Sequence, residues 1–224
     1  MKAVVVAMTT ANGLENDTIF NEYMENIHGP DLEETPGLYA WTRYENFDAE
    51  ATPRYLHVYE FEREDAGVAL DDLLRIAAKK REVGRGIDPG VAETLHIGGH
   101  DLIFSLGEQF SPEIEGMQVM LAGISDEHVD WYNKWYNTQH LPAILESPGF
   151  TNGYRFKQAK ARYTQANYFH AFIFDTTDYS GLSAGLKKTM SGKDPYVASS
   201  QGRATVIMTG VFKRRGFRHI VQCD

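Results

Sequence analysis

The chain has 224 residues, of which 42% are hydrophobic, 24% charged and 12% aromatic. These fractions exclude collagen-like, coiled-coil and disordered proteins. The formal charge of −9 repels phosphate groups, which disfavours nucleic acid and anionic membranes as partners. The apolar stretches are much shorter than the roughly 20 residues of a membrane helix. The single cysteine, Cys223, supports neither a disulfide framework nor a thiolate metal site. A cytoplasmic protein is the resulting expectation.

A long repeat organises the sequence. Residues 17–44 and 129–156 share a pattern in which the second copy follows the first at a constant distance of 112 residues, half the chain length. The matched positions are His28-x-Pro30 with His140-x-Pro142, Pro36-Gly37 with Pro148-Gly149, and Arg43 with Arg155. This regularity indicates a tandem duplication. We therefore predict one repeat in residues 1–112 and a second in residues 113–224.

Each repeat shows the same order of elements. In the first repeat we expect strands at 3–8, 38–44, 55–62 and 101–106, a helix that His28-x-Pro30 ends, and a second helix at 66–80. Proline supports the helix end because it cannot continue the backbone hydrogen bonds. In the second repeat we expect strands at 118–124, 150–156, 168–175 and 204–212, an aromatic helix before His140 and a helix at 180–190.

The order is β-α-β-β-α-β, which is the ferredoxin-like unit. Its sheet has one face without helices, and a second copy is the simplest partner that buries this face. The predicted fold class is therefore α+β, with two ferredoxin-like repeats that form one intramolecular, pseudo-dimeric barrel. We expect the helices outside this barrel and a cavity between the two sheets.

The second repeat contains the motif WYNKWYNTQHLP at 131–142, followed by Pro148-Gly149-Phe150 and Tyr154-Arg155-Phe156. This segment resembles the EthD-like branch of the dimeric α+β barrel superfamily. The resemblance implies the fold, and it implies a reaction only loosely, because the superfamily includes dehydratase-like enzymes, isomerases, cyclases, cofactor-free monooxygenases and haem-degrading enzymes. The first repeat departs from the motif, since Tyr23-Met24 stand where the second repeat has Trp135-Tyr136.

Histidine and tyrosine are the candidate acid–base residues, because the pKa of histidine lies nearest neutrality. His140 shares one helical face with Tyr132 and Tyr136. His170 lies in the middle of a strand, on the face that it shares with aromatic residues, and we expect that face to line the barrel cavity. The alternatives are a helix-end histidine favoured by the helix dipole, and hydrogen-bonded core histidines without a task.

We predict His140 and His170 as the catalytic acid–base pair, with Tyr132 or Tyr136 orienting them. The expected substrate-binding residues are the repeat-related side chains His28, His57, Tyr55, Tyr59, Tyr168, Trp135, Arg43 and Arg155. The two arginines suit a substrate carboxylate or phenolate, but a salt bridge to Glu33, Glu34 or Glu146 is the favoured alternative. His96 and His100 have only a superficial metal spacing, so we expect no metal site.

The favoured function is a lyase without a cofactor, dehydratase-like, that acts on a small apolar or aromatic oxygenated substrate. One histidine would remove a proton while a tyrosine or a second histidine protonates the leaving oxygen. The alternatives are a haem-binding protein or cofactor-free monooxygenase of the same superfamily, and a non-catalytic small-molecule binding protein. The pairing of two chains stays open.

Overall fold

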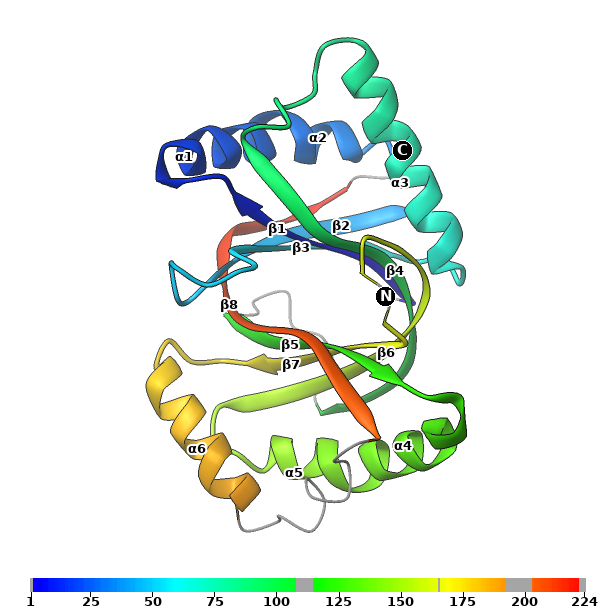
Figure 1. The fold of residues 1–224 in the computed structure, drawn as a ribbon, viewed down its shortest axis with the longest axis vertical. Coiled ribbons are helices and arrows are strands. Elements are labelled where there is room, and N and C mark those ends of the chain that lie inside the picture. Colours follow the sequence, from blue (N-terminus) through cyan, green and yellow to red (C-terminus); the bar gives the residue numbers. More distant parts are fainter. Residues whose placement is uncertain (1, 108–114, 165, 192–202, 222–224) are drawn as a thin grey trace. The chain divides into compact units, whose positions relative to one another are not determined.

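The computed structural model describes residues 2–107, 115–164, 166–191 and 203–221 (Figure 1). Cys223 lies outside these residues. The strands are β1 (Ala3–Ala11), β2 (Leu38–Asn46), β3 (Tyr55–Phe61), β4 (Ala92–Gly107), β5 (Gly116–Ile124), β6 (Phe150–Arg162), β7 (Tyr168–Phe174) and β8 (Ala204–Ile220). The longer helices are α1 (Leu14–Tyr23), α3 (Ala66–Glu82), α4 (Val129–Trp135) and α6 (Tyr179–Ser191). The described part of the chain contains no helix with the length and apolar character needed to cross a membrane.

The strands are hydrogen-bonded in the order β1-β3-β2-β8-β5-β7-β6-β4, which closes as a barrel. The prediction of an α+β fold with two β-α-β-β-α-β repeats and a barrel is confirmed. The chain divides into two compact units. Unit 1 contains residues 1–101, 158–164 and 215–224, and unit 2 contains residues 102–157 and 165–214. The ends of the three longest strands therefore belong to a different unit from their beginnings, so the units do not coincide with a cut at residue 112.

The expectation that His-x-Pro ends the first helix of each repeat is wrong. In the first repeat, helix α1 runs into the π-turn η1 (Met24–His28) and continues as α2 (Gly29–Leu32). The second repeat has the same arrangement, because α4 is followed by η3 (Tyr136–His140) and α5 (Leu141–Leu145). Proline is tolerated because it falls in the first turn after the wider π-turn, where its missing N–H group is not needed. Each motif histidine is consequently the last residue of a π-turn, a feature often found at functional sites.

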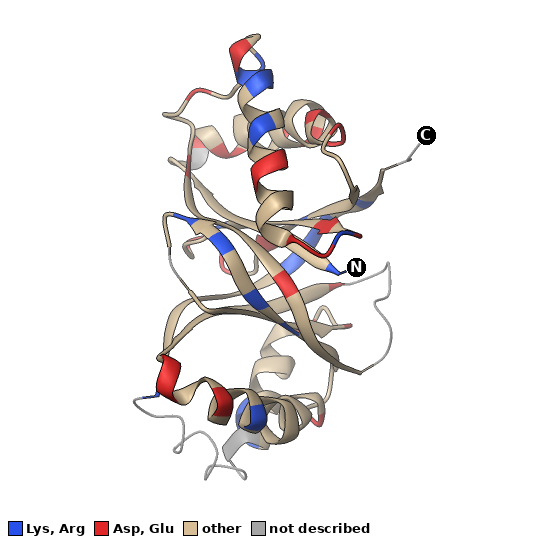
Figure 2. Ribbon diagram, turned by 90° about the vertical axis from the view of Figure 1, so that its right-hand side faces the viewer, with Lys and Arg blue, Asp and Glu red and all other residues tan. Residues whose placement is uncertain are grey.

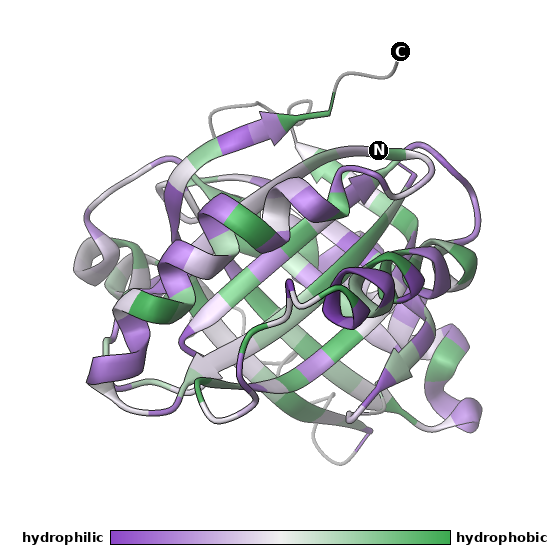
Figure 3. Ribbon diagram, turned by 90° about the horizontal axis from the view of Figure 1, so that it is seen from above, coloured by the Kyte–Doolittle hydropathy of each residue, from purple (hydrophilic) through white to green (hydrophobic). Residues whose placement is uncertain are grey.

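The core of unit 1 lies between helix α3 and the sheet. Asp65 caps the helix by accepting a hydrogen bond from the Val68 backbone N–H at 2.9 Å. Leu70 and Leu73 of α3 then pack in one cluster with Val5 of β1 and with Tyr59 of β3. Figure 3 shows hydrophilic and hydrophobic residues alternating around the helices, as one-sided packing requires.

Glycine allows helix α3 to approach strand β4 closely. A Cβ atom at Gly99 would lie 2.0 Å from the Ala66 carbonyl oxygen, so a larger residue would push the helix start away from the strand. The sheet beneath is regular, since β1 pairs antiparallel with both β3 and β4. The start of α3 is thereby fixed against the strands that bear the residues of the site.

Candidate functional site

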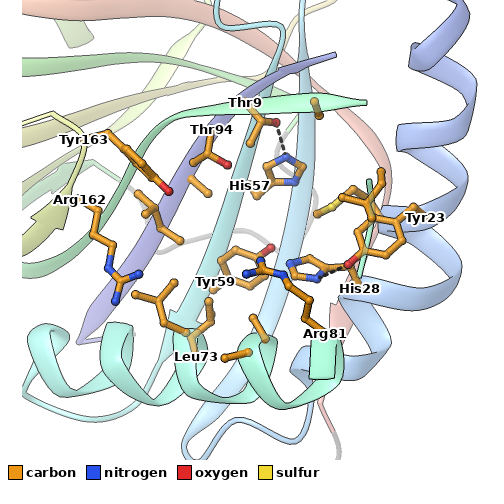
Figure 4. A pocket seen from close by; sticks show the side chains of 18 of the residues that line it. Thr9, Tyr23, His28, His57, Tyr59, Leu73, Arg81, Thr94, Arg162 and Tyr163 are labelled. Carbon is orange, nitrogen blue, oxygen red and sulfur yellow. Dashed lines mark hydrogen bonds between the residues drawn. The ribbon is translucent and has the colours of Figure 1, made fainter. Parts of the chain in front are cut away.

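Unit 1 contains a pocket of about 510 Å³ between its helices and its sheet. The size falls within the range of small-molecule sites, about 300–1,000 Å³. Figure 4 shows its polar lining, which comes from β1, α1, the π-turn η1, β3, α3, β4 and β6. The apolar lining includes Phe20, Met24, Leu73, Leu74, Ala77, Ala78, Ile87 and Ile97, and the polar lining includes Thr9, Tyr23, His28, His57, Tyr59, Thr94, Arg81 and Arg162. Its composition suits a small molecule that has both apolar and polar groups.

His28 is held by its neighbour Tyr23, one helical turn earlier. The Tyr23 hydroxyl donates to the Arg85 carbonyl oxygen at 3.2 Å and lies 3.3 Å from His28 Nδ1. Because its proton is used on the carbonyl, the hydroxyl accepts from Nδ1–H, and this assigns the tautomer. His28 Nε2 is then the nitrogen with the free lone pair. Burial lowers the pKa of His28 to about 4, and Asp31 only partly opposes this effect, so the imidazole is neutral at pH 7.

His57 lies on β3, and its ring is only 1% exposed. Its Nε2 lies 3.0 Å from Thr9 Oγ1, as Figure 4 shows. Its Nδ1 is buried and has no hydrogen-bond partner among the described residues. Burial, followed by the charge of Arg43, lowers the pKa of His57 well below its usual value. A buried polar atom without a partner is uncommon and costly, and a polar group of a bound molecule would satisfy it.

The predicted cavity between the sheets is not where these residues lie. In unit 1 the face of β3 with His57 and Tyr59 points toward the helices, since the ring of Phe20 in α1 is 6.0 Å from His57 and Tyr59 packs with α3. The opposite face contains Glu60, which accepts two hydrogen bonds from Arg218 of β8, at 2.8 and 2.9 Å. That face is not purely apolar, and the expectation that the histidine face lines the barrel interior is therefore wrong for unit 1.

Unit 2 brings together the four residues predicted as catalytic. The Tyr132 hydroxyl lies 2.9 Å from His170 Nε2. The ring of Tyr136 stacks on His170 with a centroid separation of 4.3 Å, and Trp135 stacks on His140 at 4.4 Å. Burial lowers the pKa of His140 to about 4 and that of His170 well below its usual value. The cluster thus has neutral histidines, but an aromatic ring covers His170.

The two arginines lie on strands β2 and β6, and residues from the helical segments of the same unit hold them. Arg43 donates to Asn21 Oδ1 at 2.6 Å and to Glu25 at 2.9 Å. Its acidic partner is Glu25, and not the Glu33 or Glu34 that the sequence suggests. Arg155 donates to Asn133 Oδ1 at 2.9 Å and also to Asn137. Both side chains are buried, which gives them a role in positioning the helices on the sheet.

The remaining predicted binding residues have similar internal contacts. Tyr55 accepts a hydrogen bond from the Asn21 side chain at 2.8 Å, and Tyr168 packs on Tyr132 with a centroid separation of 5.2 Å. Both tyrosines are buried. Neither lines the pocket of unit 1, whereas Tyr59 does.

His96 and His100 form a buried pair on strand β4. Their Nε2 atoms are 3.3 Å apart, above Gly98, where a Cβ atom would lie within 2.9 Å of both. Among the described residues no group of three or more histidine, cysteine or acidic side chains could hold a metal ion. The pair is a structural contact that the intervening glycine permits.

Sequence reasoning missed Thr9, Tyr23, Arg81 and Arg162 in the pocket. A signal for one of them existed: Leu70, Leu73, Ala77 and Arg81 follow one another at helical spacing, so Arg81 belongs to the same face of α3 as the core leucines. Arg162 had no such signal, because it enters unit 1 only through the long strand β6.

Comparisons with known proteins show the fold. No known protein family and no curated protein matches the sequence. An anthrone oxidase-like protein of known structure is 11% identical with a TM-score of 0.68, over 98% of this chain and 93% of that chain. A candidate monooxygenase from Fusobacterium nucleatum is 9% identical with a TM-score of 0.57, over 96% of both chains. A mutant chlorite dismutase from Candidatus Nitrospira defluvii is 8% identical with a TM-score of 0.56, over 96% of this chain and 90% of that chain. The chain has the ferredoxin-like, dimeric α+β barrel fold.

Proposed function

We propose that the pocket of unit 1 is the active site of an oxygenase whose substrate is a planar aromatic ketone or phenol. The observation that carries the proposal is a neutral histidine, His28, whose Nε2 has a free lone pair in a largely apolar pocket. Such a base suits the removal of a weakly acidic C–H or O–H proton near neutral pH. The lower dielectric of the pocket strengthens the charges that stabilise the resulting anion.

Anthrone is a simple substrate of this class. His28 Nε2 would take a proton from its CH₂ group, and the negative charge would spread over the rings to the oxygen. The carbanion would react with O₂ to give a hydroperoxide at that carbon, which loses water and leaves a second carbonyl group. One anthrone and one O₂ thus give one anthraquinone and one water. His57 Nδ1 would bind a polar group of the substrate, and its lack of another partner among the described residues supports this role.

The lyase that the sequence favours would begin with the same proton transfer. The two reactions differ in the fate of the anion, which expels an oxygen substituent in a lyase and reacts with O₂ in an oxygenase. Two similar folds bear the names anthrone oxidase-like protein and candidate monooxygenase, and this supports the oxygenase. The EthD-like resemblance of the second repeat is compatible with either reaction.

Haem binding is the second candidate, because the superfamily that the second repeat resembles includes haem-degrading enzymes. His28 would hold the iron through Nε2, because its Nδ1 donates to Tyr23 and leaves Nε2 with a lone pair. Bound haem would supply an iron that activates an oxidant. His28 would then serve as ligand, and the apolar side chains around it would exclude water.

Oxygen consumption by the purified protein with anthrone tests the proposal. We expect anthraquinone to form with equal O₂ uptake, and no product without O₂. Elimination products from an oxygenated substrate under anaerobic conditions would instead establish the lyase. Saturable binding with no product would establish a binding protein. A Soret band in the purified protein, lost in His28→Ala, would establish haem.

A further inference from the structure

Two arginines of the pocket have no ion-pair partner among the described residues. Arg81 comes from the last turn of α3, and Arg162 is the last residue of β6. Both line the pocket and are exposed to solvent. Figure 4 shows both side chains with their guanidinium groups toward the enclosed space. The pocket therefore offers two positive charges that no described residue neutralises by an ion pair.

The other charged groups of the lining are already paired. Asp71 binds Lys160 at 2.7 Å, and Arg75 binds Asp72 at 3.1 Å. Figure 2 shows basic and acidic positions following one another along α3, as these pairs require. Once they are counted as neutral, the lining keeps a net positive charge, although the chain as a whole carries −9. A local field opposite in sign to that of the whole protein favours an anionic ligand.

We propose that Arg81 and Arg162 bind an acidic group of the substrate, so that the pocket selects flat aromatic compounds that carry a carboxylate or an acidic phenol. The guanidinium fork fits the two oxygens of a carboxylate. The apolar side chains of α1 and α3 would contact the ring. This inference rests on the proposed function for the place of the reacting carbon, near His28, but the binding of the acid does not depend on turnover.

Arg81 lies at the same end of the pocket as His28, as Figure 4 shows. Its charge adds to the effect of burial in lowering the pKa of His28, and it partly opposes burial, which raises the pKa of Tyr23. A substrate whose acidic group lies at Arg81 is therefore within reach of the His28 imidazole. The same charge would stabilise the anion formed when His28 removes a proton.

The test uses two ligands that differ only in charge, 2-naphthoate and 2-naphthamide, and measures their dissociation constants by calorimetry. Hydrogen bonds to charged groups have a net worth of about 1.5–3 kcal/mol, which corresponds to a preference for the acid of about tenfold or more. We expect Arg81→Gln and Arg162→Gln to weaken naphthoate binding and to leave naphthamide binding unchanged. Added salt should weaken the binding of naphthoate but not that of naphthamide, because salt screens interactions between exposed charges.

Arg75→Gln is the matched control, since Arg75 also lines the pocket from α3 but is paired with Asp72. The inference would be overturned if the wild type bound the acid and the amide with equal affinity, or if it bound neither. It would also be overturned if Arg75→Gln lost as much affinity for the acid as Arg81→Gln and Arg162→Gln. Titration with haemin is a separate arm, because haem is also a flat ring with carboxylates and reports itself by a Soret shift. Charge selectivity without O₂ uptake would refute only the proposed function, and O₂ uptake without charge selectivity would refute only this inference.

Discussion

Each repeat has a histidine on the equivalent strand, His57 on β3 and His170 on β7, but the surroundings of the two histidines differ. In the first repeat, Met24, the first residue of the π-turn, lines the pocket together with His57. In the second repeat the matching residue is Tyr136, and its ring stacks on His170 at 4.3 Å. The matched position thus lines the pocket in unit 1 and covers the strand histidine in unit 2, although both histidines are buried.

The framework around these positions is the same in both units. Arg43 binds Asn21 in one unit, and Arg155 binds Asn133 in the other, at matching positions of the repeat. Each arginine also lies over aromatic rings of its own unit, Tyr55 in the first and Tyr136 in the second, at 5.6 and 4.5 Å. A duplicated scaffold can therefore keep its internal contacts while a few residues beneath the helix decide whether a ligand enters.

The largest expected difference between the repeats is in turnover. We expect His28→Ala to lower the rate with an active substrate by about 10²–10⁴-fold, the usual cost of removing a general base. His140→Ala should retain most of the activity, because Trp135 stacks on that ring. The sequence alone favours the reverse order, so steady-state rates of the two variants decide between the units. Near-normal turnover in a folded His28→Ala protein would move the active site away from unit 1.

The second-largest expected effect is on ligand affinity, when the matched residues of the two π-turns are exchanged. Met24→Tyr should place a ring over His57 as Tyr136 does over His170, and weaken naphthoate binding by about tenfold or more, because the larger ring occupies pocket volume that the ligand needs. Tyr136→Met makes the opposite change and should leave the affinity of unit 1 unchanged. Calorimetry measures both affinities, and unfolding curves show whether each variant is folded. Unaltered affinity in Met24→Tyr would mean that the ligand binds elsewhere.

The neutral, buried histidines should make the free energy of unfolding decrease at acidic pH. Burial lowers the pKa of His28 to about 4 from 6.5, so the unfolded chain binds a proton that the folded chain does not. The stabilising contribution is complete above pH 6.5 and is lost as the pH falls toward 4. Urea unfolding midpoints should therefore decrease over this range, and His28→Gln should reduce the slope. The rate per folded molecule should stay constant until about pH 4, and a fall near pH 6.5 would show that His28 is not buried as neutral imidazole.

The sequence predicts the fold well because the repeat makes every element appear twice. It also predicts His28, His57 and Tyr59 as binding residues, and all three line the pocket of unit 1, while their binding role stays a prediction. It assigns the wrong face of β3, because strand alternation tells which residues share a face but not which face the helices cover. The face away from the helices contains Glu60, whose partner Arg218 is 158 residues away in the sequence, and strand alternation gives no sign of such a contact.

The smallest expected effects concern the hydroxyl groups that hold the strand histidines. Thr9 Oγ1 lies 3.0 Å from His57 Nε2, and Tyr132 Oη lies 2.9 Å from His170 Nε2. Thr9→Val and Tyr132→Phe each remove the hydroxyl and leave a buried nitrogen without a partner, which costs about 1–3 kcal/mol. Both variants should therefore lower the free energy of unfolding by a similar amount.

The two variants should differ in what else they change. His57 lines the pocket, and Thr9→Val removes the hydrogen bond that holds its ring. This variant should therefore also weaken binding of naphthamide, because naphthamide binding depends on the pocket lining and not on the two arginines. His170 is held under Tyr136 in the other unit, and Tyr132→Phe should change stability alone. Calorimetry and urea unfolding on the same samples separate the two effects. A loss of affinity in Tyr132→Phe equal to that in Thr9→Val would mean that both units contribute to binding, and the difference between the repeats would then lie in packing and not in function.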